Sequence, residues 1–443
     1  MKNKGRFIKT KLFKIRAYAI AVFLFFGITL FPAVSFSGDL PSGGHGKIMR
    51  LSLLIKKALK NPGISSSALK AEALSKEITI AKALPEPVAD VGFTDANGFN
   101  NPEIGANAMS NIGFSLSQKI PFPSKLGTKS MINKYSYLSL AERTEDIKTV
   151  TTYMVKKAYY ELALIEEQIK IIKYNRLLIK LIIKDAKSRY EVGTAPAPAY
   201  IRAMLEDASL VSELITLQGE KSDLAHLLSE LTGIKRDILE KEKAVMPQVE
   251  ATYKPAAAAS APSFEIEKAY KYNPGLKSLE FASKKSSYDV EYAKEQYLPD
   301  IYLKLGYGDR YSMEPVLSVS VGISLPIYFN NYQEPLIEKA RKERLASLYD
   351  ISWKKLQIRK EAMDASRNIK TDRDNYRLYK NLYIPEARLL FKSEMASFGT
   401  GRTSAFSLLD SFRKLINSEF KMDGYQAKYF IDKSRLGLIA GSL

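Results

Sequence analysis

Residues of the types that catalyse reactions or bind metal ions are few in this chain and lie far apart. The 443 residues include no cysteine and two histidines, His45 and His226. No cluster has metal-ligand spacing, no glycine-rich phosphate-binding loop occurs, and no nucleophile stands in a pattern with a base and a residue that orients the base. The sequence therefore predicts a protein that is not an enzyme and that holds neither a cofactor nor a metal ion.

The first 37 residues have the composition of a secretory signal peptide. Seven lysines and arginines precede the apolar run from Ala17 to Phe31, and small residues such as Ser35 and Ser37 follow it. This order of charged, apolar and small residues is typical of a segment that directs export and is then removed. An uncleaved membrane anchor is the alternative.

Export also bears on the charge of the chain, which is formally +19. An exported protein does not ordinarily meet nucleic acid, so we expect no nucleic-acid partner. We interpret the lysine-rich surface as the solvated face of long helices. Because there is no cysteine to form disulfides, the stability of the exported chain must come from packing.

The rest of the chain repeats one order of landmarks twice. Each half opens with Asn-Pro-Gly, continues with a helical stretch that stops at Leu-Pro, adds two short alternating strands, and ends in a very long segment with a glycine-containing break. The landmarks are Asn61-Pro62-Gly63 and Asn273-Pro274-Gly275, Leu84-Pro85 and Leu298-Pro299, and Tyr190-Glu191-Val192-Gly193 and Phe398-Gly399-Thr400-Gly401. Their matched spacing predicts a duplicated supersecondary unit, with a first repeat at residues 38–248, a linker at 249–263 and a second repeat at 264–443.

The long segments predict unusually long helices. Residues 128–192 contain neither glycine nor proline, so a continuous helix there would be roughly 100 Å long. Apolar residues recur three and four positions apart from Val150 to Ile172, which suits packing against other helices. The second half repeats the design from Leu336 to Ile384, and Pro385 permits a kink. Each half therefore predicts a long helical hairpin, which is typical of a coiled or tubular assembly.

The short segments alternate bulky apolar residues with small or polar ones. In the last of them, Leu317, Val319, Val321 and Ile323 alternate with residues such as Ser318 and Ser320. The lengths are close to the roughly 9–11 residues with which a tilted strand crosses a bilayer. We expect the four apolar residues to face lipid, although a half-buried sheet of a soluble protein would show the same alternation.

Two strands in each half make four, and four strands cannot close a barrel. Membrane barrels start at about eight strands, and an open sheet edge is not tolerated in lipid. If these strands cross a membrane, several copies of the chain must therefore share one barrel.

The order of these landmarks resembles that of the TolC family, the outer-membrane efflux and secretion channels of Gram-negative bacteria. The resemblance runs from Leu51 to about Leu438 and rests on the duplicated landmarks, on a proline after the second strand of each half, Pro121 and Pro326, and on Ile384-Pro385-Glu386-Ala387. The segment Tyr328-Phe329-Asn330-Asn331 resembles the branch associated with heavy-metal and drug efflux.

The resemblance implies a mainly α fold with a small β part, in a homotrimer. Each protomer would give four strands to a shared 12-stranded transmembrane β-barrel and its duplicated helical hairpins to a long periplasmic α-barrel. The trimer would lie in the outer membrane and extend into the periplasm. It would pass cargo from a periplasmic adaptor (membrane fusion) protein and an inner-membrane pump, such as an RND or ABC transporter, to the outside. A periplasmic coiled-coil structural or adaptor protein is the alternative.

The resemblance also implies two kinds of functional residue. The helical tips, Val192, Gly193 and Thr194 in one half and Thr400, Gly401 and Arg402 in the other, would contact the adaptor, although each glycine could simply stop a helix. Some members of the family narrow the pore with two aspartates one helical turn apart beyond the second tip. Here Ser407 takes the first position and Asp410 the second, so we expect Asp410 to line the pore constriction, with an ion pair to Arg413 or Lys414 as the alternative.

Overall fold

The computed structural model describes residues 47–94, 110–194, 196–249, 262–310 and 313–442. They belong to one compact unit that spans residues 46–443. The predicted signal peptide, residues 1–37, and most of the predicted linker lie outside the described residues. No helix in the described ranges is both long and apolar enough to cross a membrane.

The order helix, two strands, long helical hairpin occurs twice, and the predicted fold class is confirmed. The first half contains α1 (Leu51–Ala58), α2 (Pro62–Ile80), β1 (Val88–Thr94), β2 (Asn111–Ile120), α3 (Pro123–Glu191), α4 (Ala197–Thr232) and α5 (Arg236–Lys241). The second contains α6 (Pro262–Tyr272), α7 (Pro274–Glu295), β3 (Ile301–Arg310), β4 (Met313–Ile323), the π-helical turn η1 (Phe329–Gln333), α8 (Glu334–Leu378), the π-helical turn η2 (Tyr379–Tyr383), α9 (Ile384–Gly399) and α10 (Ala405–Ile439). Helix α6 begins inside the predicted linker 249–263.

The two Asn-Pro-Gly segments have the same structural role. The side-chain oxygen of Asn61 accepts a hydrogen bond from the Gly63 N–H (2.9 Å) at the start of α2, and its amide nitrogen donates to the Leu231 carbonyl (3.3 Å) at the end of α4. Asn273 caps α7 through the Leu276 N–H (2.9 Å) and donates to the Ile439 carbonyl (3.0 Å) at the end of α10. Each asparagine thus joins the helix that precedes the two strands to the end of the hairpin that follows them.

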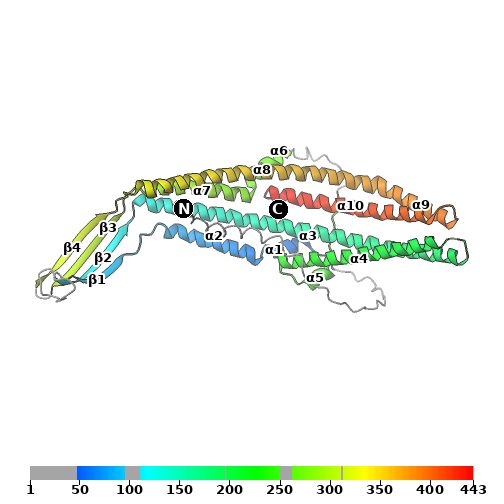
Figure 1. The fold of residues 1–443 in the computed structure, drawn as a ribbon, viewed down its shortest axis with the longest axis horizontal. Coiled ribbons are helices and arrows are strands. Elements are labelled where there is room, and N and C mark those ends of the chain that lie inside the picture. Colours follow the sequence, from blue (N-terminus) through cyan, green and yellow to red (C-terminus); the bar gives the residue numbers. More distant parts are fainter. Residues whose placement is uncertain (1–46, 95–109, 195, 250–261, 311–312, 443) are drawn as a thin grey trace, which may run out of the picture. The chain divides into compact units, whose positions relative to one another are not determined.

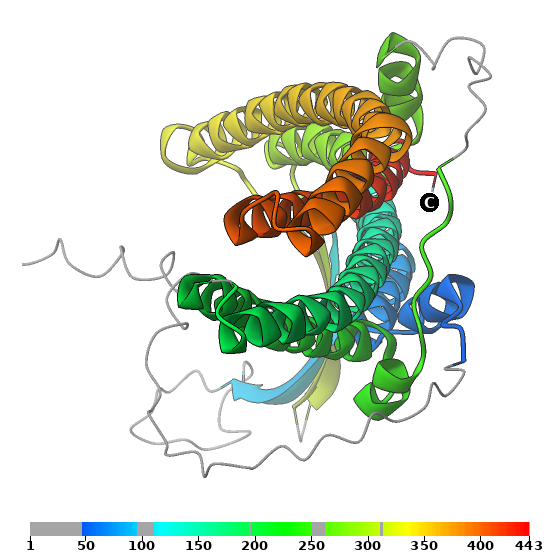
Figure 2. The same cartoon turned by 90° about the vertical axis from the view of Figure 1, so that its right-hand side faces the viewer.

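The 69-residue helix α3 is the centre of the helical part (Figure 1). It packs against α2 and α7 on the side of the sheet and against α4 and α10 further along. Its buried residues recur three and four apart, as in a coiled coil. They include Val155, Ala158, Leu162 and Ile165, then Ile172, Asn175, Ile179, Ile182 and Ala186. Seen along their length, the helices form an arc that is open on one side (Figure 2).

The four strands form one antiparallel sheet in the order β1-β2-β3-β4. The halves meet where β2 pairs with β3, for example at Leu116 opposite Leu305. Strands β1 and β4 are the two edges of this sheet.

A charged cluster ties the sheet to the helices. The Asp300 carboxylate, at the start of β3, accepts hydrogen bonds from the Lys125 ammonium (2.7 Å) and the Phe122 N–H (3.2 Å), and it pairs with Lys119 (3.1 Å). Burial favours the neutral carboxyl, but these donors outweigh burial and lower the pKa of Asp300. The carboxylate therefore stays ionised and fixes the start of α3 against the end of β2.

Candidate functional site

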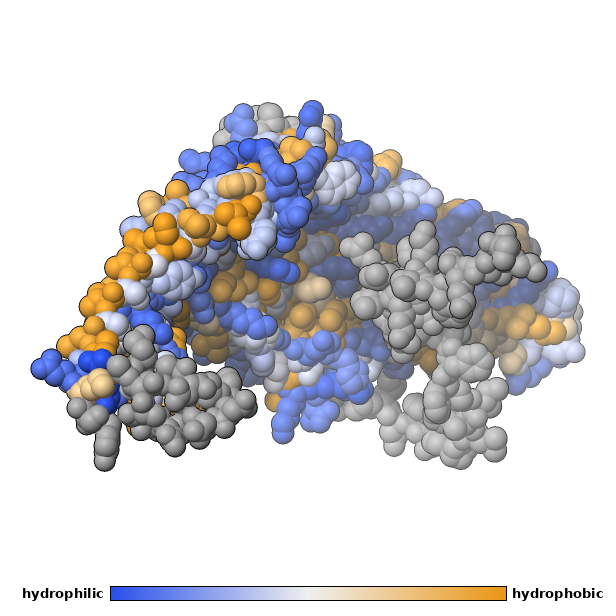
Figure 3. All heavy atoms as spheres, turned by 60° about the vertical axis from the view of Figure 1, so that its left-hand side comes forward, coloured by the Kyte–Doolittle hydropathy of each residue, from blue (hydrophilic) through white to orange (hydrophobic). Residues whose placement is uncertain are grey.

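The first candidate surface is one face of the sheet. Leu317 is 80 % exposed and Val321 69 % exposed, and Val319 and Ile323 are also exposed. Residues directly opposite each other in an antiparallel sheet share a face. Leu317 lies opposite Tyr307, which lies opposite Phe114, which lies opposite Val91. The predicted lipid-facing residues therefore belong to an apolar face that crosses all four strands. Figure 3 shows a run of orange, hydrophobic atoms along the part of the molecule that holds the sheet.

The other face of the sheet is small and polar. The same register sets Ser318 opposite Gly306, Gly306 opposite Ser115, and Ser115 opposite Asp90. The Ser115 hydroxyl donates to the Asp90 carboxylate (3.5 Å). A methyl group at Gly306 would lie 2.5 Å from the Ser318 hydroxyl, so the Ser318 side chain would have to rotate to make room for it. One face of the sheet is therefore apolar and exposed, and the other carries small and polar side chains.

The second candidate surface is the pair of hairpin tips, which have the same turn. Gly193 after α3 and Gly401 after α9 both have φ 74°, the left-handed region that glycine adopts without strain. The Thr194 N–H donates to the Arg189 carbonyl (2.8 Å), and the Arg402 N–H donates to the Ser397 carbonyl (2.8 Å). Both hydrogen bonds close the helix end in a Schellman arrangement. At both sites the backbone, not a lack of space, requires glycine, because nothing lies within 4 Å of an added Cβ.

The tips of the two hairpins are joined by Arg189. Its guanidinium donates to the Gly399 carbonyl (2.5 Å) and lies 5.5 Å from the centre of the Phe398 ring. It also pairs with Asp185 one turn earlier (2.9 Å). The ends of α3 and α9 are therefore held together.

Two adjacent residues of α4 form ion pairs with the two neighbouring helices. The buried carboxylate of Glu206 accepts from Arg413 of α10 (2.6 Å), and Asp207 accepts from Arg176 of α3 (2.9 Å). These two ion pairs could not be predicted from the sequence, because no spacing along the chain connects Glu206 with Arg413.

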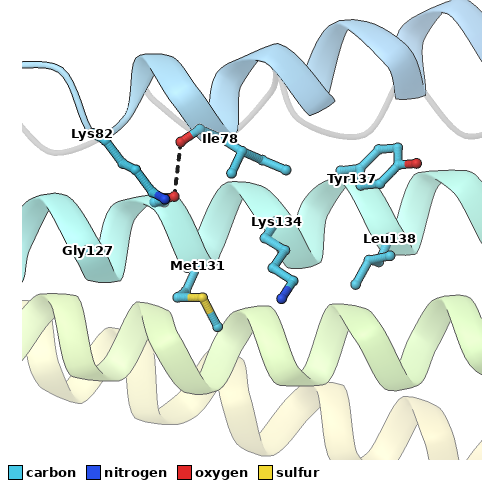
Figure 4. A pocket seen from close by; sticks show the side chains of 8 residues that line it. Ile78, Lys82, Gly127, Met131, Lys134, Tyr137 and Leu138 are labelled. Atoms are coloured by element: carbon cyan, nitrogen blue, oxygen red, sulfur yellow. Dashed lines mark hydrogen bonds between the residues drawn. The ribbon is translucent and has the colours of Figure 1, made fainter.

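Two of the surface pockets lie along the helices. One, about 440 Å³, lies near the tips between α4 and α10. It is lined by Pro198, Ile201, Arg202, Leu205, Phe406, Leu409 and Arg413. The other, about 620 Å³, lies along α2 and α3, and Figure 4 shows Ile78 and Tyr137 between these helices. Over the described residues, no group of three or more His, Cys, Asp or Glu side chains could hold a metal ion.

The Asp410 carboxylate forms an ion pair with the Lys414 ammonium one turn later (2.8 Å) and is about half exposed. Arg413, the other predicted partner, binds Glu206 instead. The Ser407 N–H donates a hydrogen bond to the Ser404 hydroxyl (3.2 Å), which caps the start of α10. Asp410 therefore lies on α10, two to three helical turns beyond the second tip.

Comparisons with known proteins point to one group. No family model matches the chain. It is 22 % identical over 432 residues to the outer membrane protein TolC of Vibrio cholerae serotype O1, covering 89 % of this chain and 95 % of that protein. The outer-membrane channel OprN has the same fold, with a TM-score of 0.76 at 14 % identity over 89 % of this chain and 90 % of that one. The CmeC outer membrane channel of Campylobacter jejuni gives a TM-score of 0.75 at 15 % identity over 94 % of both chains.

Proposed function

We propose that the chain is an outer-membrane channel of the TolC family and that it works as a homotrimer in a tripartite efflux or type I secretion system. It lies in the outer membrane and extends into the periplasm. In the trimer, cargo would pass from an inner-membrane pump, of the RND or ABC type, through a periplasmic adaptor to this channel and out of the cell.

The observation that carries the proposal is an open sheet with an exposed apolar face. Strands β1 and β4 are edges, so within the described residues each pairs on one side only. Unpaired backbone N–H and C=O groups cost several kcal/mol each in lipid, so a sheet in a bilayer must close. Pairing β4 of one copy with β1 of the next closes it, and three copies of a four-stranded sheet supply twelve strands.

The helices support the same closure. Helix α8 carries exposed apolar residues three and four positions apart on one face. They are Leu345, Leu348, Tyr349, Trp353 and Leu356. Helix α2 exposes Leu69 and Ile80. Because α8 follows edge strand β4 and α2 precedes edge strand β1, the copy that pairs with a sheet edge would also cover the apolar helix beside it.

The tips and the groove beside them favour an adaptor as the partner. Ile201, Leu205 and Phe406 are exposed in the groove between α4 and α10, where Arg202 lies 5.8 Å from the Phe406 ring. Apolar residues with an arginine at the rim suit an amphipathic helix laid into the groove. We assign the adaptor contact to this end of the molecule, including Val192, Gly193 and Thr194 and the matching Thr400, Gly401 and Arg402.

Asp410 is assigned to the narrow part of the passage. Three symmetry-related carboxylates near the tips would form a ring, and such a ring attracts cations where the walls are close. Within the protomer, Lys414 competes with passing cations for the Asp410 carboxylate.

Single-channel recording in planar bilayers tests the proposed channel function and the assignment of Asp410 to the pore. We expect the purified protein to conduct ions with a preference for cations, and Asp410→Ala to weaken that preference and the block by multivalent cations. Asp374→Asn, on α8 next to Arg373, is the matched control and should conduct like the wild type. Protein that never conducts contradicts the channel, whereas an unchanged cation preference in Asp410→Ala removes only Asp410 from the pore.

A further inference from the structure

Lys304 is a long cationic side chain among small neighbours on the polar face of the sheet. It lies in the first half of β3, and the strand register sets it opposite Ser117 of β2 and Ser320 of β4. One row closer to the strand loops, Gly306 lies opposite Ser318 on the same face. Lys304 is exposed. Because no bulky side chain surrounds it on these sides, its flexible chain is free to extend away from the sheet.

The Lys304 ammonium group has no partner in the part of the chain that the structure describes. No described carboxylate oxygen lies within 4.0 Å of it, and it donates no hydrogen bond to a described residue. The charged residues in the two neighbouring rows of this face are engaged. Lys119 pairs with Asp300 (3.1 Å), and Asp90 accepts a hydrogen bond from the Ser115 hydroxyl (3.5 Å). Lys304 is therefore a charged group that remains available to an anion from outside the protomer.

The apolar face of the sheet determines where Lys304 points. Successive side chains of a strand point to opposite faces. Leu305, the next residue of β3, lies opposite Leu116 and Val319 on the exposed apolar face. With that face toward lipid, as the proposed function requires, Lys304 projects into the water of the barrel interior. A homotrimer then has three Lys304 side chains at one level, and low-dielectric walls strengthen their field in the water between them.

This ring of lysines is far from the acidic ring assigned to Asp410. Helix α3 begins beside the sheet, ends at the first tip, and with 69 residues is roughly 100 Å long. Charges in water are largely screened beyond about 8 Å at physiological ionic strength, so the two rings act independently. Each Asp410 also pairs with Lys414 (2.8 Å), which reduces the negative charge at the tips. An anionic cargo that has passed the tips therefore meets an attractive charge in the barrel.

We propose that the barrel interior binds a negatively charged group of the cargo, a carboxylate, sulfonate or phosphate, at Lys304. The ammonium group supplies a charge-assisted hydrogen bond, and the Ser320 hydroxyl directly opposite supplies a second donor. Because the site is exposed to water, each contact is weak, which suits cargo that must also leave. The inference rests on the proposed channel function and adds the charge of the cargo to it.

Two thiol reagents of opposite charge measure the electrostatic potential at Lys304 without recording conduction. The chain has no cysteine, so Ser318→Cys, one row from Lys304 on the same face, introduces a single thiol. The measurement compares the rates at which an anionic sulfonate reagent and a cationic ammonium reagent modify this thiol in the full chain in detergent. Lys304→Gln should lower the ratio of the anionic rate to the cationic rate roughly two- to fivefold, the effect of a unit charge about 7–8 Å away in water.

Two lysine variants and a salt series are the controls for the thiol experiment. Lys304→Arg keeps the charge and should keep the ratio, and so should Lys241→Gln, which changes an exposed lysine of α5, a helix that Figure 1 shows far from the strands. Raising the salt concentration with Lys304 in place should lower the ratio, because salt screens the ammonium group. The salt series does not require Lys304→Gln to fold. A ratio that is unchanged by Lys304→Gln, or by salt, overturns the inference. A thiol at residue 318 that neither reagent reaches contradicts the proposed barrel instead.

Block of the channel by a polyvalent anion supplies a functional readout. Inorganic tripolyphosphate on the strand-loop side of a single channel in a planar bilayer should reduce the current more than the same concentration on the side of the tips. Lys304→Gln should remove this difference, whereas Lys304→Arg and Lys241→Gln should retain it. Equal block from the two sides in the wild type, or a difference that survives in Lys304→Gln, overturns the inference. Protein that never conducts contradicts the proposed channel instead.

Discussion

Val321→Arg is expected to prevent the accumulation of folded protein in the outer membrane, whereas Ser320→Arg is expected to be tolerated. Val321 lies on the exposed apolar face of β4, opposite Leu303, and Ser320 lies on the polar face, opposite Lys304. An arginine on the lipid face costs about 2–4 kcal/mol near the bilayer midplane and far less on the lumen face. Because every protomer carries the change, the cost is multiplied in a shared barrel. The heat-modifiable folded band in the outer-membrane fraction measures the outcome.

The control for that experiment takes account of charge. Arginine at position 320 would lie opposite Lys304, and like charges directly opposite one another are destabilising by themselves. Ser318→Arg avoids this, because Ser318 lies opposite Gly306. Equal loss of the folded band for Val321→Arg and both serine variants would indicate a sheet buried on two sides and would contradict a lipid-facing surface.

Replacing Gly193 and Gly401 together by leucine should abolish export while the protein still reaches the outer membrane. The left-handed conformation costs roughly 1–2 kcal/mol for a residue with a Cβ, so each tip turn is deformed but the long helical core is not. Leucine also fills the space through which a partner helix would approach the backbone. A photoreactive residue at Val192 reports the partner, and we expect its cross-link to a periplasmic protein to be lost in the double variant.

Asparagine at the same two positions distinguishes a role of the glycines in the tip turn from a role in the adaptor contact. Asparagine tolerates the left-handed conformation better than other residues that carry a Cβ, so the tip turns should persist. If the glycines serve the contact, the asparagine pair should also weaken the cross-link. A normal cross-link in the leucine pair would remove the tips from the adaptor interface, and full recovery with asparagine would limit the glycines to the turn.

Periodicity predicted the long elements well. The alternation in residues 317–323 identified the exposed apolar face of β4, because the side-chain period of a strand fixes which residues share a face. The helix predicted at 128–192 is α3, which begins earlier, at Pro123. Pro123 lies in the first turn, where a helix tolerates proline best, and the helix continues through Gly127.

Contacts between distant residues could not be predicted. The pairs of Glu206 with Arg413 and of Arg189 with Gly399 depend on how two hairpins pack, and no local pattern encodes that. The kink expected at Pro385 corresponds to η2, immediately before it, because a helix adjusts its hydrogen bonds in the turn that precedes a proline.

The number of chains in the detergent-extracted protein tests the central claim most directly. Native mass measurement of protein from the outer-membrane fraction should give three copies of the chain, because only a shared barrel pairs both β1 and β4 and covers the apolar face of α8. The emission of Trp353, the one tryptophan in the chain and 63 % exposed in the protomer, should then be that of a buried side chain. A single chain that is stable in water without detergent, with its strands folded and Trp353 exposed, would contradict the proposal.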